Sequence, residues 1–481
     1  MKNKGFTLIE LLAVIVVLAI ILIIAVPRVL RVIEDSDKES FRLTGENLLK
    51  GVKDKTLIDS MTGVSTKTYT IEDGAFVDES ISMSGELPDS GTIIVKADGS
   101  VLMAVKNDKY CLKKRYEEDK VQLVEDPSCE LPVSKIYGVR FNNATVGTRT
   151  DDAEGLTYTV NTSTITSDFD TAEIYNEIED YTDTDGNVYV KIPRFYIKKT
   201  KSEGNIWTYQ ISKDRQDIGY YLPESFRNHT NGDILDYVLI GKYNASLNNT
   251  KLESKSGTSP LVSQNINTFR TYAKNNGPSY QLIDIHAIDL IQVLFYVEFA
   301  TLDSTSIMYG YANGNASVIS SGTTNSVSTA SGSPTSNTSG KYAMKYRGIE
   351  NLWGNIWQII DGINIKNNRV YISKNPTNYT SGVFTGDYMS LGYINADVVN
   401  PPIEMGYDTN QPYANFPITV GTYTNSIYKD NYYRLSSENG VSFFGGSWNI
   451  GISGGVSCWY FGYTPSSAIS NLGSRLMKKA F

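Results

Sequence analysis

The chain has 481 residues, enough for about two to four domains. A formal net charge of -8 and a pI near 5.1 argue against a nucleic-acid-binding surface, and no basic stripe offsets them. The only two histidines are His229 and His286, which leaves little room for histidine-based catalysis or metal ligation. The 33 tyrosines, with many Asn, Ser, Thr and Gly residues, suggest instead a β-rich protein that is exported.

The N-terminus combines a short basic stretch, MKNKG, with the apolar run FTLIELLAVIVVLAIILIIAV. At 1.5 Å per residue this run makes about 31 Å of helix, which matches one hydrocarbon core. Lys2 and Lys4 predict that the N-terminus stays in the cytoplasm. No small-residue cleavage site follows the run, which disfavours a secretory signal peptide; that peptide and a simple one-pass anchor are the alternatives. The run contains one acid, Glu10, and a carboxylate in mid-membrane costs about 2.5–3.5 kcal/mol on insertion scales.

The stretch KGFTLIELL resembles the processing site of type IV prepilins and the related pseudopilins. The resemblance implies that residues 1–5 are a leader, that a prepilin peptidase cuts after Gly5, and that the new N-terminus at Phe6 is methylated. It also implies an assembly role for Glu10. In a filament, the charged amine of Phe6 on one subunit would meet Glu10 of its neighbour, and a buried charge is tolerable when it is paired.

The helix is expected to continue over residues 6–60, with a kink at Pro27 and an amphipathic second half that packs on a sheet. Alternating apolar and polar residues with Asp-Gly turns predict β-hairpins over 65–131, an arrangement similar to that of pilins. In an exported protein, Cys111 and Cys129 can close a loop of about 17 residues in a disulfide worth about 3 kcal/mol. Two reduced thiols are the alternative.

A proline-containing segment at 132–135 is expected to link this pilin-like module, residues 6–131, to a second domain. In that domain a helix is predicted over 284–303, with His286 as a structural residue rather than a ligand. The Ser/Thr/Gly-rich stretch 313–340 is predicted to be a loop without core-forming side chains.

The segment YRGIENLWGNIWQIIDG (346–362) places Trp353 and Trp357 four residues apart, on one expected buried helical or turn face. Together with FFGGSWNIGISGGVSCWYFGYTPSSAISNLGSRLM (443–477), it resembles the formylglycine-generating-enzyme type of C-type lectin fold. An oxygenase of that type needs two cysteine thiolates to hold Cu(I), and this region has only Cys458. We therefore expect no enzyme, no cofactor and no metal, but a binding module on a borrowed scaffold.

The end of the chain also resembles the variable region of receptor proteins diversified by diversity-generating retroelements. In that family GGSWN and a final GSRL stay constant, and positions templated as asparagine are rewritten. Trp459, which no such codon yields, is either framework or a departure from this pattern. The resemblance implies that the ligand-binding positions are Ile450, Ile452, Ser453, Ser457, Cys458, Tyr460, Gly462, Tyr463, Ser467 and Ile469.

Residue chemistry alone leaves two interpretations of this region. No charged residue occurs between Asn439 and Ser474, whereas Trp, Tyr, Phe, Ser and Gly are frequent. Antibody paratopes use the same mixture, and Trp and Tyr are favoured binding hot spots. The alternative is an ordinary buried β-core with uncharged turns.

The expected architecture is α+β: a long N-terminal pilin helix with a small antiparallel sheet, then a large C-type-lectin-like α+β domain over 136–481. The expected function is that of a minor or tip type IV pilin acting as an adhesin. The alternative is a pseudopilin or DNA-uptake pilin with a structural C-terminal domain. The expected partners are other pilin subunits, the prepilin peptidase and an unidentified surface ligand, without nucleic acid. The precursor is expected in the cytoplasmic membrane and the mature protein in an extracellular pilus.

Overall fold

The computed structural model describes residues 8–60, 66–77, 81–83, 85–96, 99–116, 118–314, 316–367, 369–393, 400–408, 411–422, 424–433 and 439–479. The chain forms two compact units. The first comprises the residues up to Val133 with Gln216–Ile218, and the second comprises Ser134–Arg215 with Gly219–Phe481. The division after Val133 falls inside the expected linker, 132–135.

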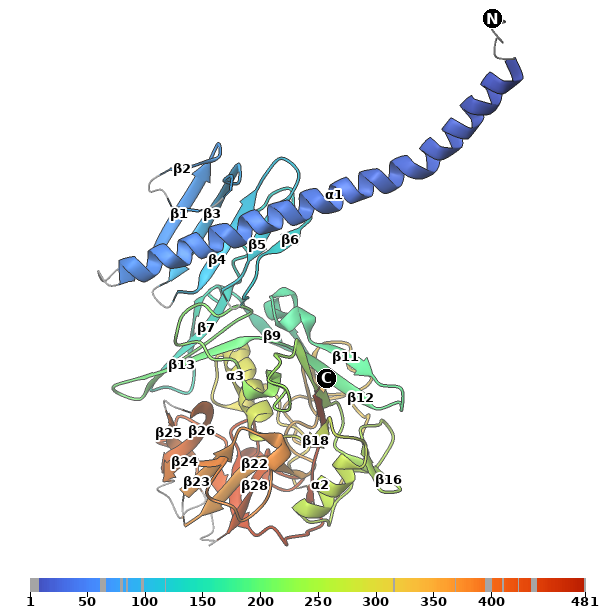
Figure 1. Ribbon diagram of the computed structural model, residues 1–481. Coiled ribbons are helices and arrows are strands. Elements are labelled where there is room, and N and C mark those ends of the chain that lie inside the picture. The colour runs from blue at the N-terminus through green and yellow to red at the C-terminus, as the bar shows by residue number, and fades with distance from the viewer. Residues whose placement is uncertain are drawn as a thin grey trace, which may run out of the picture. The chain divides into compact units, whose positions relative to one another are not determined.

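The first unit places one long helix along an antiparallel sheet (Figure 1). The helix α1 (Leu8–Ser60) continues through Pro27 without interruption. The sheet has the strand order β2-β1-β3-β4-β5-β6. Its strands are β1 (Thr66–Glu72), β2 (Ala75–Phe76), β3 (Ser90–Lys96), β4 (Val101–Lys106), β5 (Cys111–Lys114) and β6 (Gln122–Val124).

Among the described side chains of α1, those that pack on this sheet lie in its second half. Phe41, Leu48 and Val52 are buried in the cluster that the sheet also lines, and their spacing places them on one helical face. Val29 and Ile33, which belong to the half expected to pack, are exposed instead. Both residues precede Phe41, which is the first α1 residue in the buried cluster, so they lie outside the part of the helix that the cluster includes.

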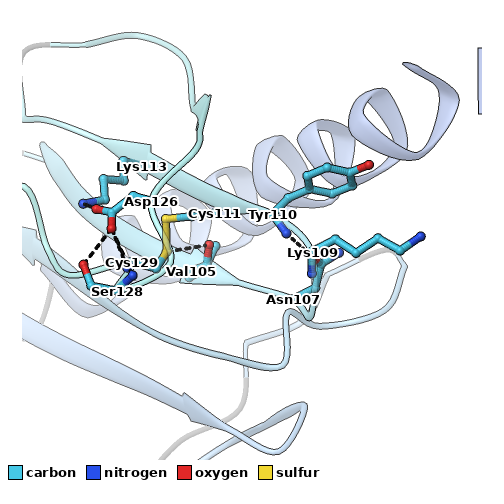
Figure 2. The surroundings of a disulfide bond; sticks show 9 residues. All are labelled: Val105, Asn107, Lys109, Tyr110, Cys111, Lys113, Asp126, Ser128 and Cys129. Carbon is cyan, nitrogen blue, oxygen red and sulfur yellow. Dashed lines mark hydrogen bonds and ion pairs between the residues drawn. A yellow bond between two sulfur atoms is a disulfide. The ribbon is translucent and has the colours of Figure 1, made fainter. Parts of the chain in front are cut away.

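Cys111 and Cys129 form a disulfide, with their Cα atoms 5.6 Å apart (Figure 2). Cys111 begins β5 and Cys129 follows β6, so the bond fastens the end of the first unit to its sheet. Beside it, the Asp126 carboxylate accepts hydrogen bonds from Lys113 Nζ at 2.5 Å and from Ser128 Oγ at 2.7 Å. These hydrogen bonds lower the pKa of Asp126, so this carboxylate stays charged down to strongly acidic pH.

The second unit is built mainly from antiparallel sheets. One sheet, of order β13-β14-β7-β8, contains β7 (Ile136–Asn142), β8 (Thr148–Asp151), β13 (Tyr196–Ser202) and β14 (Ile206–Ser212). A second, of order β11-β12-β15-β31-β18, contains β11 (Glu179–Thr182), β12 (Val188–Pro193), β15 (Tyr237–Gly241), β18 (Tyr280–Leu282) and β31 (Leu476–Lys479). A third, of order β21-β20-β19-β10-β9, contains β9 (Tyr158–Val160), β10 (Thr164–Ser167), β19 (Ser331–Gly332), β20 (Lys345–Tyr346) and β21 (Ile349–Glu350).

The fourth sheet contains strands from Trp357 to Gly473. Its order is β24-β23-β22-β28-β29-β27, with β30 pairing parallel to β22. Its strands are β22 (Trp357–Lys366), β23 (Arg369–Ser373), β24 (Tyr388–Tyr393), β27 (Tyr432–Tyr433), β28 (Gly440–Phe444), β29 (Trp459–Tyr463) and β30 (Leu472–Gly473). Two further hairpins are formed by β16 (Ser246–Asn248) with β17 (Lys251–Glu253), and by β25 (Pro402–Asp408) with β26 (Gln411–Val420).

Helices are few in the described part of the second unit, and α3 (Ile285–Phe299) is the central one (Figure 1). The Asp284 carboxylate caps it by accepting from the Ala287 amide at 2.9 Å, and every α3 side chain is buried. His286 Nε2 lies 2.9 Å from the Ser373 carbonyl oxygen, which is a structural contact. The other helices are α2 (Ile266–Lys274) and α4 (Ser304–Ile307), and short 3₁₀ helices are η1 (Asp168–Thr171), η2 (Tyr175–Glu177), η3 (Glu224–Phe226), η4 (Pro376–Asn378) and η5 (Gly451–Ser453).

Two segments differ from expectation. Trp353 lies in a turn and Trp357 begins β22, and the two side chains pack in different apolar clusters, so the shared helical face is wrong. The stretch 313–340 is also more than a surface loop. The buried Glu350 carboxylate accepts hydrogen bonds from the Gly322 amide at 2.7 Å and the Thr324 hydroxyl at 2.6 Å, so polar contacts anchor it to the interior.

Candidate functional site

The processing positions at the N-terminus, Gly5 and Phe6, lie outside the described residues. The backbone of Glu10 belongs to the first turns of α1. The apolar side chains of Leu8 and Leu12 beside it are exposed in the single chain. Within the part of the chain that the structure describes, no helix is long and apolar enough to cross a membrane.

The terminal stretch begins with a turn that only glycines fit. Gly445 has a positive φ of 87°, and a Cβ there would lie 2.9 Å from the Leu352 carbonyl oxygen. Gly446 has a φ of 89°, and its Cβ would lie 2.7 Å from Ile450 Cγ2. The Gly-Gly pair therefore reverses the chain close against the preceding turn and places Ile450 at the start of η5.

Arg475 holds the other end of the stretch. Its buried guanidinium donates to one side chain and four backbone carbonyls: Gln358 Oε1 and the oxygens of Gly241, Lys242, Glu350 and Asn351. These acceptors come from three separate parts of the second unit. Burial lowers the pKa of Arg475 to about 9. Arg475, the arginine of GSRL, therefore holds these three parts of the second unit together through buried hydrogen bonds.

Three of the expected ligand-binding residues point inward. Ser453, Ser457 and Cys458 are buried. The Ser457 hydroxyl lies 2.6 Å from the Tyr296 hydroxyl of α3, and the Ser457 amide donates to an Asp430 carboxylate oxygen at 2.7 Å. The ligand-binding role expected for these three positions stays a prediction, and their side chains are enclosed in this structure.

The remaining expected positions are at least partly exposed. Ile452 on η5 is exposed, and the others are half-buried: Ile450, Tyr460, Gly462, Tyr463, Ser467 and Ile469. Ile450, Tyr460, Tyr463 and Ile469 all pack at the border of one apolar cluster. We call these four residues the tyrosine rim.

Stacked rings support the tyrosine rim. The ring centroids of Tyr460 and Tyr463 lie 4.9 Å apart, and that of Tyr463 lies 5.3 Å from Phe443. Trp357 contacts Tyr460 at a centroid distance of 5.7 Å. Burial, followed by the influence of Tyr463, raises the pKa of Tyr460 to about 12, so its hydroxyl stays neutral at ordinary pH. The rim offers aromatic area and hydroxyl groups without charge.

Sequence reasoning missed the residues that complete this cluster from elsewhere in the chain. Leu261 and Tyr272 pack on the same apolar cluster as the rim, and Tyr272 belongs to α2. No motif marks them, because they lie far from 443–477 in sequence and become neighbours only through the fold.

Cys458 is the free cysteine of the described residues. Cys458 is fully buried, and burial raises the pKa of its thiol well above the usual value, so no thiolate is present. Among the described residues, no group of three or more His, Cys, Asp or Glu side chains is arranged to hold a metal ion.

Residues 1–26 match the family described as the prokaryotic N-terminal methylation motif. The chain carries a prepilin motif. This motif implies processing by a prepilin peptidase and assembly with other pilins, and it indicates a precursor anchored in the membrane that then joins a pilus. The match confirms the prediction made from KGFTLIELL.

Several solved structures match the chain at low sequence identity. The Major Tropism Determinant M1 variant is 11% identical over 79% of this chain and 80% of that chain, with a TM-score of 0.26. The P3c variant is 10% identical over 79% and 81%, with a TM-score of 0.24, and PvdO from Pseudomonas aeruginosa is 11% identical over 63% and 98%, with a TM-score of 0.26. At such low identities and TM-scores, the matched structures assign neither a fold nor an activity to this chain. No curated protein matches the chain.

Proposed function

We propose that the chain is a minor or tip pilin acting as an adhesin, whose second unit is C-type-lectin-like and binds an extracellular ligand through the tyrosine rim. The observation that carries the proposal is the combination on one chain of a methylation motif at residues 1–26 and an uncharged aromatic surface near the C-terminus. The motif would allow the chain to assemble into a filament. The tyrosine rim would then be the ligand-binding surface that the filament carries.

The tyrosine rim suits recognition because its rings are already held in place. Stacking of Tyr460 and Tyr463 on each other and on Phe443 restricts their side-chain freedom before a ligand arrives. Less entropy is then lost on binding, which is the main advantage of pre-organised contact surfaces. Ile452 beside them is exposed and adds apolar area.

The size of the second unit supports a minor or tip position. It spans most of the 481 residues, whereas the pilin-like unit ends at Val133. Repeating such bulk at every position of a uniform shaft would crowd neighbouring subunits. We propose no catalytic role and no nucleic-acid partner, because a net charge of -8 opposes phosphate binding.

A second candidate function has one observation in its favour. Burial of Ser453, Ser457 and Cys458 is what an ordinary structural domain requires, and it favours a pseudopilin or DNA-uptake pilin with a structural cap. The two candidates differ in whether removing this chain affects attachment.

Attachment of piliated cells tests the proposal. A strain that lacks the chain is compared with its parent for pilus number by electron microscopy and for attachment to a panel of host cells. We expect unchanged pilus number and reduced attachment to at least one cell type, restored by the wild-type chain. Equal attachment across the panel, with the chain present in parental pili, rejects the adhesin and favours the structural cap.

A further inference from the structure

Three side chains from distant parts of the second unit meet in its interior. Lys199 comes from β13, Asp289 from α3 and Asn415 from β26. The Lys199 side chain is fully buried, that of Asp289 is 4% exposed, and Asn415 is 5% exposed. A charged or amide group is rarely enclosed in this way without a specific reason, because its desolvation is costly.

The Asp289 carboxylate and the Asn415 carboxamide both lie within hydrogen-bond distance of Lys199 Nζ. Lys199 Nζ donates to Asp289 Oδ1 at 2.5 Å and lies 3.4 Å from Asn415 Oδ1. At its other end, the carboxamide of Asn415 donates through Nδ2 to the Tyr209 hydroxyl at 2.7 Å. The amine therefore faces the carbonyl end of the carboxamide, and Tyr209 fixes its orientation.

The remaining contacts complete the enclosure. Lys199 Nζ also donates to the Pro412 carbonyl oxygen at 2.8 Å, and the Tyr221 hydroxyl donates to Asp289 Oδ2 at 3.1 Å. The Tyr209 ring stacks on Trp207 at a centroid distance of 5.6 Å. The surroundings are thus aromatic and closed to water.

Burial acts on both partners of the pair in the direction of neutrality. It lowers the pKa of Lys199 and raises the pKa of Asp289. A proton that moves from the ammonium to the carboxylate removes both charges from the interior. What remains is a neutral amine, which is the nucleophilic form of lysine.

We propose that Lys199 and Asn415 become joined by an intramolecular isopeptide bond, formed with Asp289 as the catalytic acid and base. Lys199 Nζ attacks Asn415 Cγ, and a C–N bond forms. Asp289, which holds the proton received from the ammonium, gives that proton to Nδ2 and takes another from the attacking nitrogen. The bond between Cγ and Nδ2 breaks and ammonia leaves. The reaction requires no oxidant, reductant or cofactor, since an amide replaces an amide.

The bond has a structural consequence for the C-terminal stretch. It ties β13 to β26, across a separation of 216 residues. On β26, Phe416 packs on Trp459 and Phe461 of β29, with ring centroids 5.7 and 5.9 Å apart. Residues 132–481 contain only one cysteine, Cys458, so no disulfide can form within them. The amide gives this unit a cross-link that reduction cannot open.

Mass spectrometry of the purified full chain tests the proposal. We expect the intact mass to be lower than the sequence mass by one ammonia and by the two hydrogens lost in the Cys111–Cys129 disulfide. After tryptic digestion, we expect one branched peptide that contains Lys199 and Asn415, with no cleavage after Lys199. The variants Lys199→Arg, Asn415→Ala and Asp289→Asn are each expected to lack the branched peptide. An intact wild-type mass that retains the ammonia overturns the proposal.

A matched control separates the chemistry from general disturbance of the core. Lys345 is also buried, and its Nζ donates to the Val327 carbonyl oxygen at 2.9 Å, so Lys345→Arg should keep the branched peptide. Asp289→Asn with native circular dichroism and no cross-link assigns the catalytic role to Asp289. A cross-link in folded Asp289→Asn removes that role. The wild-type measurement decides the bond itself even if every variant fails to fold.

Discussion

Asp430 is a buried carboxyl group beneath the segment that contains Ser457. It accepts from the Ser457 amide at 2.7 Å and from the Ser304 hydroxyl at 3.0 Å. Burial raises the pKa of Asp430 to about 8, from an ordinary value of 3.8. The folded chain therefore keeps a proton here that the unfolded chain releases above about pH 4. A raised folded pKa means stability that is complete below pH 3.8 and decreases as the pH rises toward 8.

Asp430→Asn is predicted to flatten this dependence, since the amide imitates the protonated acid. Between about pH 4 and 8 the contribution of Asp430 to the unfolding free energy has a slope of at most about 1.4 kcal/mol per pH unit. The measurement is urea unfolding of wild type and variant at several pH values, taken as their difference so that other titrations cancel. A difference that does not change with pH contradicts the assignment.

Substitution of Arg475 is also predicted to lower the free energy of unfolding. Its donors serve five oxygens, and a lysine has only three N–H donors. Arg475→Lys therefore leaves at least two buried acceptors without a donor, at about 1–3 kcal/mol each. We expect the urea midpoint to fall by the equivalent of about 2–6 kcal/mol. The half-buried Arg194, which lies 3.7 Å from an exposed Asp236, is the control. Arg194→Lys should cost less than about 0.5 kcal/mol.

At the scale of elements, the disulfide joins β5 to the segment after β6. Replacing Cys111 and Cys129 by serine is predicted to destabilise the first unit by about 3 kcal/mol, because the unfolded loop gains freedom. Thiol titration supplies a direct check. The unfolded wild-type chain should show one reactive thiol before reduction, from Cys458, and three after it. Ser128→Ala, beside the bond, should keep that thiol count and cost about 1 kcal/mol.

Elements differ in how far the sequence determines them. The apolar pattern over 284–303 predicts the helix α3, and the structure adds Asp284 as its N-terminal cap. The stretch 313–340 is predicted to be a loop without core-forming side chains, because it is a low-complexity segment rich in Ser, Thr and Gly. The structure instead holds it by Glu350, a residue outside the stretch. A buried carboxylate that receives backbone amides from a distant segment leaves no trace in local composition.

At the scale of the whole chain, some candidate sites can be found from the sequence and others only from the fold. The prepilin motif is contiguous, so the sequence alone was sufficient to find it. The ten positions assigned to the binding face came from a linear pattern, which does not distinguish Ile452, exposed on η5, from Ser457, buried against Tyr296. The meeting of Lys199 with Asn415 required the fold, since 216 residues separate them.

The whole chain also makes a prediction that no single unit does: assembly and recognition should be separable. Glu10→Ala is expected to abolish incorporation into pili, because the new N-terminal amine then lacks its partner in the filament.

Ile452→Asn with Tyr463→Ser should leave incorporation unchanged and reduce attachment to the responsive cell type, since both side chains reach the surface. Ser457→Ala removes a buried hydroxyl contact and should lower stability without altering ligand preference. Immunogold labelling of pili, attachment counts and thermal unfolding measure the three effects. Loss of attachment in Ser457→Ala at full stability, with the rim variant unaffected, would move recognition away from the tyrosine rim.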